Sequence, residues 1–318
     1  MNRQKPVLIL AQEDDKQLTR LMDIPHMLGN EVAAFTDAAV TATAILNWSG
    51  SQKLLRTVFA MSPSVTWVHS RSVGLDSVLF PELVESDVTL TNSRGVFSAS
   101  LGEFALAAIL YFAKDFRRML RNQSAGIWQP FDVEAVAGQT VGIVGYGDIG
   151  REVAVRVRAM GMCVLAVKRH IPRKKDRLVE HYYAPETLCE MLPHCDYIVV
   201  TAPLTDETRY MIDEEEFTTM KSTAVVVNVG RGPVIREAAL VHALRSGRIK
   251  GAALDVFEKE PLPPEHVLFQ LENVLVSPHC ADNTPDWKDR AMAFFLEQYD
   301  RFERGEPFKN IVNKRLGY

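Results

Sequence analysis

The chain has 318 residues, of which 47% are hydrophobic, so it can bury the cores of two domains. Its 36 basic and 40 acidic residues leave a net charge of −4, and no overall positive field favours nucleic acid or an anionic membrane as a partner. The most apolar stretch, "FALAAILYF" at 104–112, is far shorter than the roughly 20 residues that cross a membrane.

The N-terminal segment and the cysteines indicate a cytoplasmic protein. The opening sequence, "MNRQKPVLILAQEDD", has too short an apolar run for a signal peptide and turns acidic at once. The four cysteines show neither a C-x-x-C pair nor a metal-binding spacing. We therefore expect reduced thiols, no disulfide and no bound metal.

Short apolar runs in the first hundred residues predict one α/β domain. "PVLILA" (6–11), "TWVHS" (66–70) and "VTLTN" (88–92) are typical of buried strands, and a polar helical segment follows the first. "SLGE" at 100–103 matches a capping box, in which serine and glutamate side chains satisfy free amides at a helix start. The sequence behind it, "FALAAILYFAKDFRRMLRN", predicts one long helix that bridges two domains.

From residue 139 onward the sequence predicts a second α/β domain. Its apolar runs are "QTVGIVGYG", "MCVLAVK", "DYIVVTAP", "TAVVVNVG", "GAALDVF" and "NVLVSPH". Because their apolarity is continuous rather than alternating, we expect strands buried on both faces of a doubly wound parallel sheet. A final amphipathic helix is predicted with Thr284 as its N-cap and Pro285 at its first position.

A glycine-rich turn marks the start of this second domain. In "VGIVGYGDIG" (141–150), Gly145, Gly147 and Gly150 have the G-x-G-x-x-G order directly after a strand and before a helix. In dinucleotide-binding domains the first glycine permits the tight turn, the second admits the pyrophosphate, and the third lets helix and strand pack closely. We interpret the turn as a dinucleotide site, the alternative being a glycine-rich turn without a ligand.

The end of the next strand predicts which dinucleotide binds. NAD-binding domains carry Asp or Glu at this place, where it accepts hydrogen bonds from the adenosine ribose. Here "MCVLAVKRH" (162–170) ends in Lys168 and Arg169, whose charges suit the 2′-phosphate of NADP(H). We interpret the following cations, at 173–175, as solvated loop charges.

Three later strand ends carry side chains that suit acid–base chemistry. Arg231 follows one strand in "VVVNVGRGPVIRE" (225–237). Asp255 and Glu260 follow the next strand in "ALDVFEKEPLP", and His279 follows the one beyond in "NVLVSPHCADNT". Ligands of such sheets bind outside the carboxyl ends of the strands. A histidine paired with a carboxylate can give and take protons near neutral pH, and an arginine fork matches a carboxylate or a polarised carbonyl. Each residue alone could be an ordinary surface or ion-pair residue, but their order behind the glycine turn predicts an active site.

These motifs resemble those of the D-isomer-specific 2-hydroxyacid dehydrogenases. "VGYGDIG", "NVGRGPVI", "GAALDVFEKEPLP" and "SPHCADNT" carry the resemblance, which extends through almost the whole chain. It implies that Arg231 binds and polarises a 2-oxo acid, that His279 exchanges the proton, and that Glu260 orients His279. It also implies that the backbone amides of Val73 and Gly74 bind the substrate carboxylate.

The resemblance further implies the cofactor site. It assigns cofactor contacts to Gly145, Gly147, Asp148, Ile149, Gly150, Lys168, Arg169, Ala202, Pro203, Thr208, Val229, Gly230, Arg231, Asp255 and His279. Among these, Asp148 and Ile149 are expected at the pyrophosphate, and Asp255 at the nicotinamide carboxamide. NAD-dependent relatives carry Asp where this chain has Lys168, so NADP(H) is favoured over NAD(H).

The family's fold implies two Rossmann-like domains with doubly wound parallel sheets and a cleft between them. Residues 1–100 and 284–318 are expected to form a discontinuous substrate domain, and residues 101–283 the dinucleotide-binding domain. Relatives usually pair through the dinucleotide domain, so a homodimer is expected.

The resemblance implies an NAD(P)-dependent oxidoreductase that reduces a small 2-oxo acid, such as glyoxylate or hydroxypyruvate, to the D-2-hydroxy acid. Segments 71–74 and 92–98, with Trp287, are expected to line the substrate pocket. Two alternatives stay open. A formate or phosphite dehydrogenase would use the same cofactor site. A dinucleotide-sensing co-repressor would keep Arg231, Glu260 and His279. The basic pair at 168–169 favours reduction over oxidation.

Overall fold

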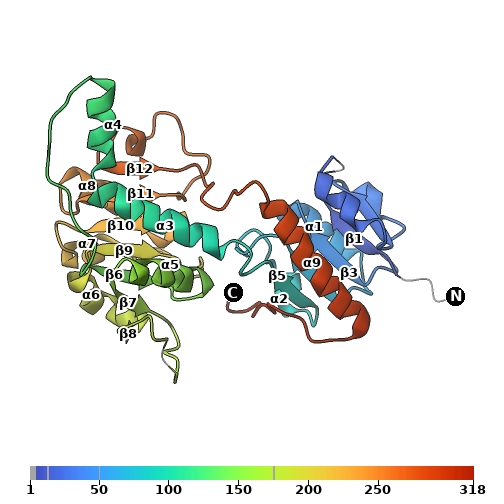
Figure 1. Cartoon of the computed structure of the whole chain (residues 1–318). Coiled ribbons are helices and arrows are strands. Elements are labelled where there is room, and N and C mark those ends of the chain that lie inside the picture. The colour runs from blue at the N-terminus through green and yellow to red at the C-terminus, as the bar shows by residue number, and fades with distance from the viewer. Residues whose placement is uncertain (1–4, 13, 50, 175) are drawn as a thin grey trace. The chain divides into compact units, whose positions relative to one another are not determined.

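The structure, a computed structural model, describes residues 5–12, 14–49, 51–174 and 176–318 (Figure 1). These residues contain one parallel sheet of five strands and another of seven. The predicted fold class, α/β with two parallel sheets, is confirmed. Among the described helices, none combines the length and apolarity needed to cross a membrane. No group of three or more His, Cys, Asp or Glu side chains in the described ranges is placed to hold a metal ion.

The chain divides into two compact units. The first comprises Met1–Val96 with Thr284–Tyr318, and the second comprises Phe97–Asn283. The sequence placed the first boundary four residues later, after residue 100. The chain therefore leaves the first unit just ahead of a long helix and re-enters it just ahead of the last helix.

The first unit is built on the five-stranded sheet. Its strands are β1 (Val7–Leu10), β2 (His26–Gly29), β3 (Ala44–Asn47), β4 (Trp67–Ser70) and β5 (Thr89–Asn92). They lie in the order β2-β1-β3-β4-β5 and all pair in parallel, so the direction of travel across the sheet reverses between β1 and β3. The crevice outside the carboxyl ends of the strands at such a reversal is the usual place for a ligand.

The helices of the first unit pack around that sheet. They are η1 (Lys16–Leu21), η2 (Val32–Phe35), α1 (Gln52–Ala60), α2 (Pro81–Glu85) and α9 (Trp287–Arg304). Phe295 of α9 stacks on Trp67, with ring centroids 5.6 Å apart. His69 is fully buried beside them, and burial lowers the pKa of its imidazole to about 3. This histidine is a neutral core residue and has no role in proton exchange near pH 7.

The second unit is built on the seven-stranded sheet. Its strands are β6 (Thr140–Val144), β7 (Cys163–Val167), β8 (His181–Tyr183), β9 (Tyr197–Val200), β10 (Val225–Asn228), β11 (Gly251–Leu254) and β12 (Val274–Val276). They lie in the order β12-β11-β10-β9-β6-β7-β8, and every pair is parallel. The reversal falls between β6 and β9, which places the glycine-rich turn after β6 at the expected ligand position.

Helices cover both faces of this sheet (Figure 1). They are α3 (Ser98–Ala113), α4 (Phe116–Ser124), α5 (Asp148–Ala159), η3 (Pro185–Thr187), α6 (Leu188–Met191), η4 (Leu192–His194), α7 (Glu214–Thr219), η5 (Gly232–Val234), α8 (Glu237–Arg245) and η6 (Val267–Phe269). Helix α3 packs against α5. Right-handed crossovers put α5 on one face and α6, α7 and α8 on the other, because the strands they join advance in opposite directions.

Two helix starts differ from the sequence predictions. The capping box at 100–103 is wrong, since α3 begins at Ser98 without a side-chain cap and Ser100 instead donates to the carbonyl of Ala281, 2.7 Å away. The last helix begins at Trp287, and the Thr284 hydroxyl donates to Asp286 at 2.8 Å instead of accepting from a helix amide. In both cases the hydroxyl predicted to cap a helix bonds to another group, distant in sequence for Ser100 and local for Thr284.

The long helix predicted across 104–122 is also interrupted. Asp115 has a left-handed backbone, with φ of 50°, and separates α3 from α4. Its carboxylate accepts a hydrogen bond from the amide of Arg118 at 3.2 Å and so caps the start of α4. The chain therefore turns at this point, and a second short helix follows.

Candidate active site

The glycine-rich turn after β6 has the shape that a dinucleotide pyrophosphate requires. Gly145 has φ of +96°, and a Cβ there would lie 2.5 Å from the Ala202 Cα, so no other residue fits. A Cβ on Gly147 would meet nothing within 4 Å, which leaves the backbone open to a ligand. At Gly150 a Cβ would lie 3.0 Å from the Ile143 side chain, where α5 packs on β6. These are the three roles that the G-x-G-x-x-G order predicts.

Helix α5 points its N-terminus at this turn. Gly147 is its N-cap, and Asp148 and Ile149 occupy the first turn, as expected of residues beside a pyrophosphate. Amides at the start of a helix have no intrahelical acceptor and carry partial positive charge, so they suit a phosphate. The Thr201 hydroxyl donates to the Gly145 carbonyl at 2.7 Å and fixes the turn against the end of β9.

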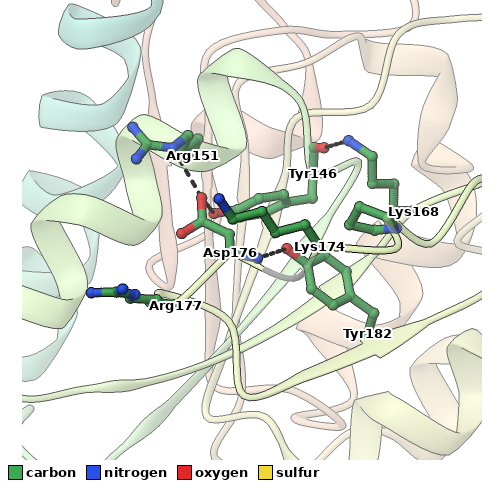
Figure 2. Close-up of a pocket in the computed structure, with 8 residues that line it drawn as sticks. Tyr146, Arg151, Lys168, Lys174, Asp176, Arg177 and Tyr182 are labelled. Atoms are coloured by element: carbon green, nitrogen blue, oxygen red, sulfur yellow. Dashed lines mark hydrogen bonds and ion pairs between the residues drawn. The ribbon is translucent and has the colours of Figure 1, made fainter.

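An open pocket of about 390 Å³ adjoins the turn on the side of β7 and β8 (Figure 2). It is lined by Tyr146, Arg151, Lys168, Pro172, Lys174, Asp176, Arg177 and Tyr182. Four of these side chains are cations and one is a carboxylate, so the pocket favours an anion. Lys168 donates to the Tyr146 carbonyl at 2.7 Å, which places its ammonium at the edge of the glycine-rich turn.

Asp176 organises the wall of this pocket. Its Oδ2 accepts hydrogen bonds from the Tyr146 hydroxyl at 3.1 Å and from Arg151 Nε at 2.9 Å (Figure 2). Partial burial opposes its charge, but these bonds and the Leu178 amide hold the pKa of Asp176 below its usual range. Burial beside Asp176 raises the pKa of Tyr146, so the phenol stays protonated and keeps donating.

The structure separates the two cations predicted at the end of β7. Lys168 lines the pocket, whereas Arg169 forms an ion pair with Glu207 and does not line it. Lys174, interpreted from sequence as a solvated loop charge, lines the pocket instead; Lys175 lies outside the described residues. Sequence reasoning missed Arg151, Asp176 and Arg177, because nothing in the local pattern shows that the loop after β7 folds back onto α5.

Residues at the ends of β9 and β10 form the opposite wall of the turn. Ala202 lies against both Gly145 and Gly230, and a Cβ on Gly230 would come within 2.7 Å of the Ala202 carbonyl. Thr208 donates to the carbonyl of Pro203 at 2.6 Å and closes the loop after β9. Val229, predicted to flank the cofactor, is buried directly after β10.

Asp255 fixes the strand ends that carry the acid–base pair. It is 1% exposed, and its Oδ1 accepts hydrogen bonds from the Ser277 hydroxyl at 2.6 Å and the amides of Cys280 and Ala281 at 2.9 and 3.1 Å. Its Oδ2 accepts none from the described part of the chain. That oxygen can receive the carboxamide donor for which Asp255 was proposed.

His279 and Glu260 form a hydrogen-bonded pair. Nδ1 of His279 lies 2.7 Å from Oε2 of Glu260, whose other oxygen accepts from the Phe257 amide at 3.0 Å. The bond to Glu260 raises the pKa of His279 despite opposing burial and the charge of Arg231. Burial opposes ionisation of Glu260, but the bonds from His279 and Phe257 lower its pKa below the usual range. Both shifts favour the form of the pair in which His279 is an imidazolium and Glu260 a carboxylate.

The imidazole of His279 is partly exposed, and its Nε2 bonds to nothing within the described ranges. Arg231 stands at the end of β10, where its Nη1 donates to the Gly230 carbonyl at 2.9 Å. Its charge acts on both members of the pair, lowering the pKa of His279 and of Glu260. The structure thus brings Arg231, Glu260 and His279 to one edge of the sheet.

The first unit holds the predicted substrate amides in a pinned loop. The Val73 carbonyl accepts from Asn92 Nδ2 at 2.9 Å, and the Ser72 carbonyl accepts from the Ser70 hydroxyl at 3.2 Å. Across the described residues, the amides of Val73 and Gly74 donate no hydrogen bond. The loop is therefore held through its carbonyls, and its amides stay available to donate to a carboxylate.

Comparison with known proteins places this site in a family context. Residues 106–281 match the family model described as D-isomer specific 2-hydroxyacid dehydrogenase, NAD binding domain. The chain is 36% identical over 268 residues to the glyoxylate reductase of Korarchaeum cryptofilum, a match that covers 81% of this chain and 79% of that protein.

Two solved structures show the same architecture over the whole chain. The D-isomer specific 2-hydroxyacid dehydrogenase of Xanthobacter autotrophicus Py2, in complex with NADPH and MES, has a TM-score of 0.84 and 30% identity, covering 99% of this chain and 100% of that one. The NADPH-dependent glyoxylate/hydroxypyruvate reductase of Sinorhizobium meliloti, in complex with NADP and sulfate, has a TM-score of 0.83 and 26% identity, covering 99% and 100%.

Proposed function

Because the chain belongs to the D-isomer specific 2-hydroxyacid dehydrogenase family and is an NAD(P)-dependent oxidoreductase, we propose that it reduces a small 2-oxo acid to the D-2-hydroxy acid with NADPH. Glyoxylate and hydroxypyruvate are the proposed substrates. The observation that carries the proposal is the 2.7 Å pair of His279 and Glu260, beside Arg231 and behind a glycine turn shaped for a dinucleotide.

The chemistry of the pair follows from its geometry. NADPH, when bound, supplies the hydride that reaches C2 of the substrate. Nδ1 of His279 is engaged by Glu260, so Nε2 is the nitrogen that donates a proton to the carbonyl oxygen as it gains negative charge. Arg231 draws electron density from the carbonyl with its planar fork. Glu260 fixes the tautomer of His279 and stabilises its charged form.

In the first unit, the amides of Val73 and Gly74 hold the carboxylate of the 2-oxo acid. The loop carbonyls are already bonded to Asn92 and Ser70, so the loop can receive an anion without rearrangement.

We assign the basic pocket beside β7 to the 2′-phosphate of NADP(H). It lies next to the turn that takes the pyrophosphate, and Lys168 occupies the position of the ribose-binding acid in NAD enzymes. Arg151, Lys174 and Arg177 add positive charge to the same pocket. The relative from Sinorhizobium meliloti is described as NADPH-dependent, which supports this preference. Arg169 is still proposed to contact the cofactor, although its guanidinium forms an ion pair with Glu207.

We further propose that the protein is a homodimer and works in the cytoplasm. Apolar side chains are exposed along α4 and the segment that follows it, namely Phe116, Met119, Leu120, Ile127, Trp128 and Val133, with Trp128 98% exposed. Several exposed apolar groups within one stretch of the chain support an interface there, and a second copy of the chain is the occupant proposed here. The four cysteines are free thiols, as in a reducing compartment.

The test is a screen of NADPH and NADH oxidation over glyoxylate, hydroxypyruvate, pyruvate and oxaloacetate, with formate and phosphite offered to NAD and NADP in the reverse direction. We expect NADPH-linked reduction of at least one 2-oxo acid. Oxidation of formate or phosphite in its place, or tight dinucleotide binding with no turnover of any acid, would refute the proposal and favour an oxidising relative or a dinucleotide sensor respectively.

A further inference from the structure

The first unit carries a group of side chains that the proposed reaction has not used. It lies at the carboxyl ends of β1, β3 and β4, where the order of the sheet reverses between β1 and β3. Asp15 follows β1, Asn47 and Trp48 come from the end of β3, and Arg71 follows β4. Trp287, the first residue of α9, completes the group. This reversal is the position at which sheets of this topology bind ligands.

Arg71 is held in place by aromatic rings. Its guanidinium carbon lies 5.1 Å from the ring centroid of Trp48 and 5.0 Å from that of Trp287. Trp48 is buried and donates its indole N–H to Asp15 at 2.8 Å, so the ring cannot turn. A guanidinium that contacts π-faces is held through its plane, and its N–H edge stays available for hydrogen bonds.

The hydrogen-bonding capacity of this group exceeds what its own members use. Within the described ranges no side-chain N–H of Arg71 donates a hydrogen bond, although the side chain is half-buried. Asp15 directs its Oδ2 to Trp48 and to Lys288, at 2.8 and 3.1 Å, rather than to Arg71. Asn47 is 1% exposed, and neither polar atom of its side chain has a partner among the described residues.

Such an arrangement is costly unless a ligand completes it. The buried amide of Asn47, without partners, loses the hydrogen bonds that water would have supplied, and the guanidinium of Arg71 is partly withdrawn from water. Two cations, Arg71 and Lys288, face one carboxylate, Asp15, so the local charge favours an oxygen acceptor. Asp15 acts on Arg71 through its charge but forms no hydrogen bond with it, because Oδ2 accepts from Trp48 and Lys288 and Oδ1 has no partner among the described residues.

The position of Arg71 relative to the substrate loop sets which part of the substrate it reaches. It precedes the Val73 amide by two residues and the Gly74 amide by three, so backbone of at most ~11 Å separates Arg71 from the carboxylate site. Its own amide bonds to the Asn47 carbonyl at 3.2 Å, which fixes the start of the loop to β3. A small acid held by its carboxylate on the amides therefore has its other substituents within reach of this side chain.

We propose that Arg71 is a specificity-determining residue that binds an oxygen acceptor on C3 of the 2-oxo acid. The inference rests on the proposed function. It predicts that acids with a hydroxyl or a carboxylate on C3 are preferred over an acid with a bare methyl group. Hydroxypyruvate carries a hydroxyl on C3, oxaloacetate carries a carboxylate there, and pyruvate carries neither. The three acids are otherwise alike, so they show which acceptor Arg71 recognises.

The experiment compares kcat/KM for these three acids in the wild type, Arg71→Met and Arg71→Lys. Methionine keeps an apolar chain against the two indoles without the donors, and lysine keeps a charge without the planar fork. Arg56→Met is the matched control, since Arg56 belongs to the same unit and pairs with Glu82 on the surface. Far-UV circular dichroism and the NADPH Kd, which depends on the second unit, check that each variant is folded.

We expect the ratio of kcat/KM for hydroxypyruvate or oxaloacetate to that for pyruvate to fall about 10- to 100-fold in Arg71→Met, the loss typical of a charged hydrogen bond. A smaller fall is expected in Arg71→Lys and none in the control. The acid whose ratio falls further identifies the acceptor.

Three results would overturn the inference. An unchanged ratio in both folded variants would make Arg71 structural, and an equal loss on all three acids would assign it to their shared 2-oxo acid group. Either result leaves the proposed function standing. A wild type that reduces no 2-oxo acid would refute the proposed function itself, and the inference with it.

Discussion

At the scale of single residues, the account depends on the proton held by His279. Replacing His279 with alanine removes the donor while leaving the glycine turn and the basic pocket untouched. General acid–base groups typically contribute about 10²- to 10⁴-fold, so we expect kcat to fall by that factor with the NADPH Kd little changed. The control is His26→Ala, since His26 is an exposed histidine of the first unit. Wild-type kcat in the His279 variant would assign the proton to another group.

Glu260 should control the pH range of the reaction. The bond from Glu260 raises the pKa of His279, so the imidazolium persists to higher pH than an ordinary histidine would allow. Reduction consumes this proton, and kcat/KM should therefore be constant at low pH and decline as pH rises through that raised pKa. In Glu260→Gln the decline should begin at lower pH. Profiles that superimpose for the two enzymes would separate Glu260 from the titration of His279.

The sequence alone identified this pair, because both residues follow strands of one parallel sheet and such strands end at one edge. It could not distinguish Lys168 from Arg169. The two are adjacent, but Lys168 faces the glycine turn and Arg169 pairs with Glu207, a partner 38 positions away. Side-chain direction after the last ladder residue depends on contacts distant in sequence, which a local pattern does not contain.

At the scale of elements, strand ends were predictable and helix starts were not. The buried runs that became β6, β9, β10 and β11 stood out because parallel strands are apolar on both faces. β2 was missed because His26 and Met27 are exposed. β3 was missed although its four residues are all buried, as are those of β1 and β4, which were predicted. The false capping box at Ser100 shows that a hydroxyl goes to whichever partner the tertiary fold brings closest.

The loop joining β7 to β8 gives the most specific prediction for the cofactor. Lys168→Asp places a carboxylate where the 2′-phosphate is proposed to bind, so it should repel NADPH and accept hydrogen bonds from the ribose of NADH. We expect the preference for NADPH in the wild type to reverse. Added salt should weaken NADPH binding more than NADH binding in the wild type, because exposed charges are screened over about 8 Å at physiological ionic strength.

Titration of both cofactors into the two proteins, at low and high salt, measures this. Lys221→Asp serves as the control, since Lys221 pairs with Asp196 away from the pocket. Equal affinity of the wild type for the two cofactors, or a Lys168→Asp variant that still prefers NADPH, would show that the basic pocket does not determine which cofactor binds.

At the scale of the whole molecule, each unit is an α/β body with its own parallel sheet. The length and composition of the chain predicted only that it could bury two hydrophobic cores. The division of labour came from motifs: dinucleotide and acid–base groups lie on the second unit, and the pinned Val73–Gly74 loop on the first. The Arg71 group was not predicted as a unit, because Asp15, Trp48 and Trp287 are brought together only by the reversal of the first sheet and the return of α9.

Assembly is testable through the exposed apolar segment around α4. Trp128→Asp puts a charge on its most exposed side chain, and we expect the dimer to dissociate into monomers because a carboxylate is costly to bury at an interface. Met22→Asp is the control, being an exposed apolar residue of the first unit. Light scattering after gel filtration gives the mass. A monomeric wild type, or a Trp128 variant that keeps the dimer mass, would place the interface elsewhere or remove it.

The central claim is that the protein moves a hydride to C2 of a 2-oxo acid and sets one configuration there. The most direct measurement incubates the wild type with hydroxypyruvate and NADPH deuterated at the transferred position of C4, and analyses the product by NMR and chiral chromatography. The account predicts glycerate of the D configuration with deuterium at C2. Unlabelled or L-configured glycerate, or no glycerate with the cofactor left reduced, would contradict it.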